Sequence, residues 1–138
     1  MKTNKSKKLL LVVIAMGSIF AMVGCSEQAT SSGNQISYES ISAEEAKTIM
    51  DTEKEYIIID ARTQSEYEEG HIEGAILMPE YEVKERAEAE LKDKEQLILV
   101  YCRSGRRSKI ASQNLVDLGY TNVKDFGGII DWTYDIEK

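Results

Sequence analysis

Short unbroken apolar runs alternate with amphipathic segments over most of the chain. Runs such as residues 56–59 and 96–101 are typical of strands buried on both faces, and the segments between them repeat apolar residues at helical spacing. This alternation predicts an α/β domain with a mainly parallel central sheet flanked by helices. The predicted strands are 56–59, 75–78, 96–101 and 123–126, and the predicted helices are 43–51, 63–69, 83–91 and 108–118.

Polar residues mark where several of these helices begin. Ser42 and Glu45 have the spacing of a capping box, and Thr63 with Glu66 repeats it. Ser108 is predicted to be the N-cap of the helix that follows the third strand.

The first 24 residues differ from the rest of the chain. Four lysines between positions 2 and 8 precede an apolar stretch that reaches Val23, which is too short for a typical spanning helix. The segment ending at Cys25 resembles a bacterial lipobox, with Met22 where Leu is usual. We therefore expect a signal peptide at 1–24, a lipidated Cys25, a flexible spacer over 25–35 and a folded domain at 36–138. The alternative is an uncleaved anchor, and both place the domain outside the cytoplasm, at a bacterial cell membrane.

Charge restricts the expected partners. The chain has a formal net charge of −7, and beyond residue 24 there are 13 basic against 24 acidic residues. Because binding to phosphate backbones needs clustered positive charge, nucleic acid is not an expected partner. Any anion site must be local, and no protein partner is identified by the residues.

The two cysteines have different expected fates. If Cys25 carries a lipid, Cys102 is a free thiol with no partner for an internal disulfide. A lone thiol outside the cytoplasm suggests chemical use, although a buried cysteine that serves only as a small apolar residue is the alternative.

The segment after Cys102 carries local positive charge. Residues 102–109 contain Arg103, Arg106, Arg107 and Lys109 and no acid, and they connect a strand end to a helix start. Backbone N–H groups in such a loop favour an anion, so we expect a lowered pKa for the Cys102 thiol and a nucleophilic thiolate. The alternative is a solvated loop whose arginines have no ligand.

From about residue 36 to the end, several motifs follow one another in a fixed order: Ile58-Ile59-Asp60-Ala61-Arg62, Glu66-Tyr67, 70–75, Pro79, 102–108, Gly119-Tyr120, Val123 and 127–132. In these motifs and their order the chain resembles the single-domain rhodaneses, a family of sulfurtransferases.

The resemblance implies a rhodanese-like three-layer domain and a Cys102 persulfide that carries sulfane sulfur. A small anionic donor such as thiosulfate would supply the sulfur, and a thiol or cyanide-like acceptor would remove it. Asp60 and Arg62 would support the site from the neighbouring strand, and no cofactor or metal is expected. The residues expected to hold the donor are Arg103, Ser104, Gly105, Arg106, Arg107 and Ser108.

Two alternatives to this enzyme remain open. One is a non-catalytic rhodanese-like module that binds or senses redox state. The other is the chemistry of related phosphatases, which carry an Arg six residues after the Cys and a His before it; here these positions are Ser108 and Tyr101. His71 is expected to form hydrogen bonds within the fold rather than to act as a general base.

Overall fold

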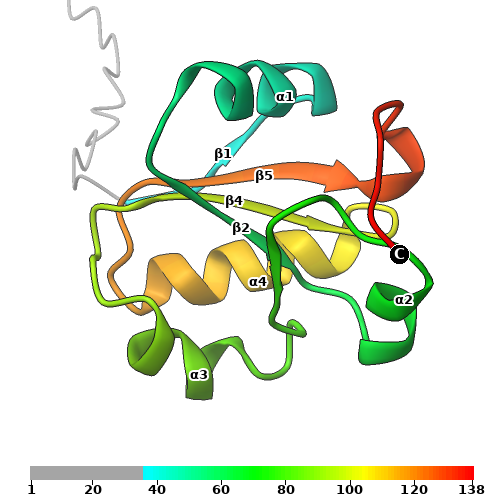
Figure 1. The fold of residues 1–138 in the computed structure, drawn as a ribbon. Helices are drawn as coiled ribbons and strands as arrows, with labels where there is room; N and C mark the ends of the chain where they lie inside the picture. Colours follow the sequence, from blue (N-terminus) through cyan, green and yellow to red (C-terminus); the bar gives the residue numbers. More distant parts are fainter. Residues whose placement is uncertain (1–35) are drawn as a thin grey trace, which may run out of the picture. The chain divides into compact units, whose positions relative to one another are not determined.

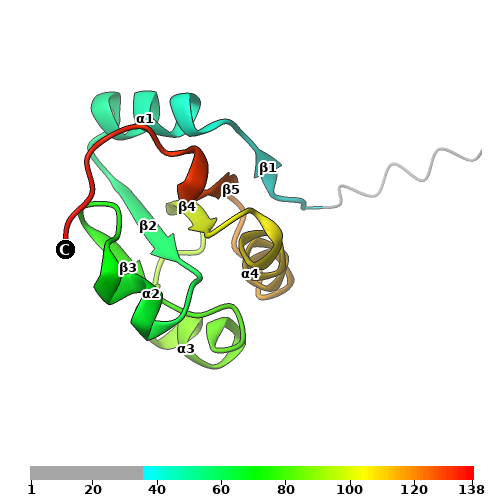
Figure 2. The same cartoon turned by 90° about the vertical axis from the view of Figure 1, so that its right-hand side faces the viewer.

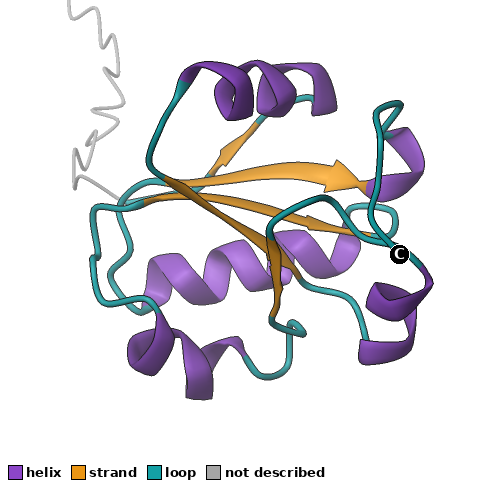
Figure 3. Cartoon of the chain, in the orientation of Figure 1, coloured by secondary structure: helices purple, strands orange, loops and turns teal. Residues whose placement is uncertain are grey.

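The computed structural model describes residues 36–138. The expected signal peptide, the lipidated Cys25 and the spacer lie outside the described residues. In the described part, no helix is both long and apolar enough to cross a membrane. The elements in chain order are β1 (Glu39–Ser40), α1 (Ala43–Thr52), β2 (Tyr56–Asp60), α2 (Gln64–Glu69), β3 (Ala75–Leu77), α3 (Val83–Glu90), β4 (Leu97–Cys102), α4 (Arg106–Asp117), β5 (Val123–Gly128) and the 3₁₀ helix η1 (Ile129–Asp131) (Figures 1 and 3).

The strands form one sheet in the order β1-β5-β4-β2-β3, and all neighbouring strands are parallel. The predicted parallel sheet is therefore confirmed. Strand β1 was not predicted, because two residues are too few to show a strand pattern. Between β4 and β5 the register shifts, so that Val100 pairs with Asp125 but Cys102 pairs with Gly128. Such irregularities redirect the backbone and are common beside active sites. Here the irregularity places Gly128 opposite Cys102.

Helices cover both faces of the sheet, which confirms the predicted three-layer architecture. Helix α1 lies on one side, and α3 and α4 lie on the other (Figure 2). Alternate residues of β4 enter the two cores, because successive side chains of a strand point in opposite directions. Leu99 and Tyr101 join the core beneath α1, whereas Val100 and Cys102 join the core beneath α3 and α4. The Cys102 side chain therefore lies on the α4 side of the sheet.

The helix starts agree with the sequence in two cases and differ in the third. Ser42 and Thr63 both form complete capping boxes, as predicted. The predicted N-cap at Ser108 is wrong, because α4 begins at Arg106 and its N-cap is Gly105. Gly105 has a φ of 100°, a left-handed conformation that favours glycine and turns the chain into the helix early. Ser108 is consequently buried in the first turn.

Candidate active site

Cys102 is the last residue of the central strand β4, and a short loop wraps its sulfur. The side chain is buried, with 1% of its surface exposed, and it is the only cysteine in residues 36–138. The backbone N–H of Gly105 donates to Cys102 Sγ at 3.1 Å. Because α4 starts at the next residue, the positive end of this helix also lies at the sulfur. This arrangement stabilises negative charge on the sulfur.

Two opposing effects act on the pKa of the Cys102 thiol. Burial raises the pKa, but hydrogen bonds from the Ser108 hydroxyl and from the N–H groups of Ser108, Gly105 and Ser104 together lower it below the ordinary value. The Ser108 hydroxyl has one proton to donate, and two carbonyl oxygens compete with the sulfur for it. Ser108 Oγ lies 3.2 Å from the carbonyl oxygen of Gly105 and 3.3 Å from that of Gly127. The loop therefore favours the thiolate, the nucleophilic form of cysteine.

The loop arginines are not equivalent. Arg107 forms two hydrogen bonds of 2.7 Å with the carboxylate of Glu66, and both side chains are partly buried. The hydrogen bonds from Arg107 lower the pKa of Glu66 to about 2. Arg103 and Arg106 are exposed, and within the described residues neither forms a salt bridge. Arg107 is thus held against α2, and Arg103 and Arg106 remain available to an anion.

Glu66 and Gly128 belong to this site, although no pattern in the sequence placed them in it. In the sequence, Glu66 is marked by its capping box and by the Glu66-Tyr67 segment of the family resemblance, neither of which assigns it to the site. A Cβ built on Gly128 would lie 2.3 Å from the carbonyl oxygen of Arg103 and 2.6 Å from Cα of Ser104. The start of η1 adds a hydrogen bond of 3.2 Å from the Ile130 N–H to the Arg103 carbonyl. The end of β5 and the start of η1 therefore pack against the backbone of the Cys102 loop and support it.

A buried polar network fixes the end of β4 immediately before Cys102. Asp60 is fully buried, and both of its carboxylate oxygens accept hydrogen bonds of 2.6–3.0 Å from Arg62. The Tyr101 hydroxyl donates to Asp60 at 2.6 Å and accepts the Ile72 N–H at 3.1 Å. Burial, reinforced by the nearby carboxylate, raises the pKa of Tyr101 and keeps it neutral. Asp60 and Arg62 therefore contact the strand end and not the sulfur.

His71 makes contacts typical of a structural residue. Its ring stacks on Tyr67 with a centroid separation of 3.7 Å, and its Nδ1 lies 3.0 Å from the Tyr67 carbonyl oxygen. Its Nε2 is 3.5 Å from a carboxylate oxygen of Glu137, to which its backbone is also bonded. Within residues 36–138, no group of three or more His, Cys, Asp or Glu side chains is placed to hold a metal ion.

Comparison with known proteins identifies the family. The model described as the rhodanese-like domain matches residues 42–135. The chain belongs to the rhodanese-like domain family. The fold described above, a parallel sheet flanked by helices, is the rhodanese-like fold, and solved structures of this family share it.

Named relatives of this rhodanese-like domain include sulfurtransferases. The chain is 42% identical over 73 residues to the thiosulfate sulfurtransferase PspE of Escherichia coli K12, a match covering 53% of this chain and 70% of that protein. It is 36% identical to the putative sulfur carrier protein YrkF of Bacillus subtilis, covering 75% of this chain and 55% of that protein. A solved structure described as a rhodanese with anions from E. coli superposes with a TM-score of 0.57 and 38% identity, covering 60% of this chain and 98% of that one.

Proposed function

We propose that this rhodanese-like domain is a sulfurtransferase that works through a persulfide on Cys102. In the first step the Cys102 thiolate attacks the outer sulfur of thiosulfate, the S–S bond of the donor breaks, and sulfite leaves with the bonding electron pair. In the second step a cyanide ion or a thiolate attacks the terminal persulfide sulfur. The electron pair of that S–S bond returns to Cys102, which becomes a thiolate again.

The observation that carries this proposal is the set of donors aimed at Cys102. The Gly105 N–H lies 3.1 Å from Sγ, and donors from Ser104 and Ser108 join it in lowering the pKa of the thiol. A persulfide at neutral pH is also an anion, so a preorganised ring of N–H groups stabilises both the nucleophile and the intermediate. No separate general base is needed, because the attacking group is already ionised.

The exposed arginines support an anionic donor. Arg103 and Arg106 border the loop and are free of ion pairs within the described residues, whereas Arg107 is bound to Glu66. A guanidinium group suits an oxyanion because it presents several N–H donors in one plane. We therefore assign donor binding to Arg103, Arg106 and the loop N–H groups of Ser104, Gly105 and Ser108.

The decisive experiment is to load the full chain with thiosulfate and record its intact mass. We expect a gain of one sulfur atom that cyanide or a thiol removes, and no gain in Cys102→Ser. Arg106→Ala is expected to slow loading at low salt by about tenfold without affecting the thermal unfolding midpoint. Loading that persists in Cys102→Ser would show that the nucleophile is assigned incorrectly.

Failure to load would favour the alternative class. If neither thiosulfate nor glutathione persulfide adds sulfur to a folded protein, the chain is better described as a non-catalytic binding or redox-sensing module.

We also propose that a lipid on Cys25 attaches the domain to a bacterial cell membrane, on the side facing away from the cytoplasm. The support is the basic and apolar segment before Cys25 and its lipobox-like end. Labelled fatty acid is expected to be incorporated into the chain but not into its Cys25→Ala variant. Equal labelling of the two would refute the anchor.

A further inference from the structure

We propose that the sulfur acceptor is a protein whose reactive cysteine is surrounded by acidic residues, and that it docks on a basic rim around the Cys102 loop. This inference rests on the proposed function and specifies the acceptor of the same site. The basic rim consists of Arg103, Arg106, Lys109, Ile110 and Ile130.

The depth of the sulfur explains why the acceptor must contact the rim. Cys102 is 1% exposed, and a second sulfur extends only about 2 Å beyond the first. An acceptor sulfur has to reach the terminal persulfide sulfur through the opening that the Cys102 loop surrounds, which we call the mouth of the loop. The groups that flank a protein thiol are then pressed against the surface around the mouth, whereas cyanide is small enough to enter without touching that surface.

The rim is positively charged, in contrast to the rest of the domain. Residues 96–116 contain no Asp or Glu, although the chain beyond residue 24 is strongly acidic. Arg106 and Lys109 are exposed on successive turns of α4, and within residues 36–138 no carboxylate lies within salt-bridge distance of either or of Arg103. The carboxylates of Glu66 and Glu80 both raise the pKa of Arg107, the loop arginine that is ion-paired. The other ion-paired lysines and arginines of the described domain are Lys47, Arg62, Arg86, Lys94 and Lys124.

Two exposed isoleucines extend the same surface. Ile130 is 65% exposed, and the hydrogen bond from its N–H to the Arg103 carbonyl holds its backbone beside the loop. Ile110 is 41% exposed and lies one helical turn after Arg106. Exposed apolar side chains are common on protein surfaces, but beside unpaired charges they add contact area that a protein partner can cover. A small anion would need the charges but not the isoleucines.

Charge complementarity decides which partner fits. Unpaired cations attract carboxylates and accelerate the encounter of oppositely charged molecules. A basic partner would be repelled by the charges of the rim, and a neutral partner would gain nothing from those charges. A membrane surface carries negative charge too, but it has no thiol and would cover the mouth through which the donor enters.

The test compares three synthetic peptides of equal length in which one cysteine is flanked by Glu and Asp, by Ser and Gln, or by Lys. The full chain in mild detergent is loaded with thiosulfate, and the second-order rate of persulfide discharge is measured for each peptide and for cyanide. Rates are corrected for the thiolate fraction and intrinsic reactivity of each peptide, since flanking charges change both. We expect the acidic peptide to react about tenfold faster than the neutral one at low salt, and the basic peptide to react slowest.

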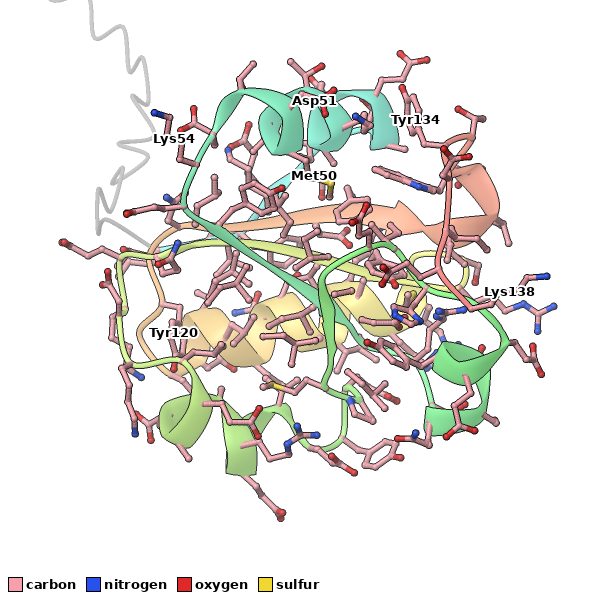
Figure 4. All side chains as sticks on the ribbon, viewed as in Figure 1. Met50, Asp51, Lys54, Tyr120, Tyr134 and Lys138 are labelled. Carbon is pink, nitrogen blue, oxygen red and sulfur yellow. The ribbon has the colours of Figure 1, made fainter. Side chains whose placement is uncertain are left out.

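Two rim variants outside the loop and one matched control separate docking from chemistry. Lys109→Glu is expected to slow the acidic peptide by more than it slows cyanide, which is also an anion, and so to remove the preference for the acidic peptide. Ile130→Ser is expected to slow all three peptides and to leave cyanide discharge unchanged. Lys54→Glu makes the same charge change two residues before β2, at the end of the sheet where this strand begins, and is expected to leave the ranking intact (Figure 4).

The outcomes distinguish this proposal from the proposed function. If Cys102 loads and cyanide discharges it, but the peptides react at equal corrected rates, the acidic acceptor is refuted and the sulfurtransferase stands. The acidic acceptor is likewise refuted if Lys54→Glu and Lys109→Glu have equal effects. It is also refuted if phosphatidylglycerol vesicles slow persulfide discharge while the peptides show no preference. Failure of Cys102 to load refutes the proposed function itself.

Discussion

Adding one methyl group at Gly128 is expected to displace the backbone of the Cys102 loop and so to disable the candidate site. Gly128→Ala introduces a Cβ that would lie 2.3 Å from the carbonyl oxygen of Arg103 and within 3 Å of two further backbone atoms of the Cys102 loop. The neighbours are main-chain atoms, which cannot rotate away as a flexible side chain would. Either β5 or the loop must therefore move.

The size of the movement follows from the geometry. Ordinary contact begins at 3.4 Å, so the Arg103 carbonyl and the new methyl group must separate by about 1 Å. Overpacking of this kind costs about 1–3 kcal/mol of folding free energy. A displacement of about 1 Å in a group that positions a reacting atom reduces rates by about a hundredfold. We therefore expect a modest loss of stability and a much larger loss of sulfur loading.

Gly127→Ala is the matched control at the adjacent residue. Gly127 has a φ of 84°, which costs a substituted residue about 1–2 kcal/mol, but a Cβ there would have no heavy atom within 4 Å. The two variants are thus expected to unfold at similar temperatures, measured by circular dichroism, while only Gly128→Ala loads sulfur slowly. If both load at the wild-type rate, or both lose loading equally, the close approach of Gly128 to the loop does not support the site.

Two further predictions concern pH. Glu66→Gln removes a carboxylate whose pKa is lowered to about 2 in the folded state, so the stabilisation is fully present above the unfolded pKa of 4.5 and is lost as pH falls toward 2. Allowing for partial exposure, we expect Glu66→Gln to cost about 2 kcal/mol in urea unfolding at pH 7 and less than half of that at pH 3; an equal cost at both values would contradict the ion pair. Ser108→Ala is expected to raise the pKa of Cys102 and move the pH profile of iodoacetamide alkylation upward. Ser112→Ala, whose buried hydroxyl has no hydrogen-bond partner among the described residues, is expected to leave that profile unchanged, and equal shifts in the two variants would refute the role of the Ser108 hydroxyl.

Local patterns in the sequence were enough to predict the main elements of the fold. Unbroken apolar runs identified β2 and β4 as buried strands, because only strands covered on both faces need apolar residues at every position. The capping boxes at Ser42 and Thr63 depend on residues three apart, so short-range spacing located those helix starts. The same kind of information placed Cys102 at a strand end, where ligands collect in parallel sheets. The signal peptide and the lipid on Cys25 stay predictions.

The tertiary structure decided which groups act on the sulfur and which only support it. Arg107 is held by Glu66, which lies 41 residues earlier in the chain, so no local pattern distinguished it from Arg103 and Arg106. The register shift between β4 and β5 brings Gly128 against the loop, and a missing side chain leaves no chemical signal in a sequence. Ser108 is a residue type favoured at N-caps, yet the left-handed turn at Gly105 starts the helix earlier. The Ser108 hydroxyl is therefore buried in the first turn of α4. Sequence periodicity reports what a segment buries, whereas the distances between polar groups are set by how the segments pack.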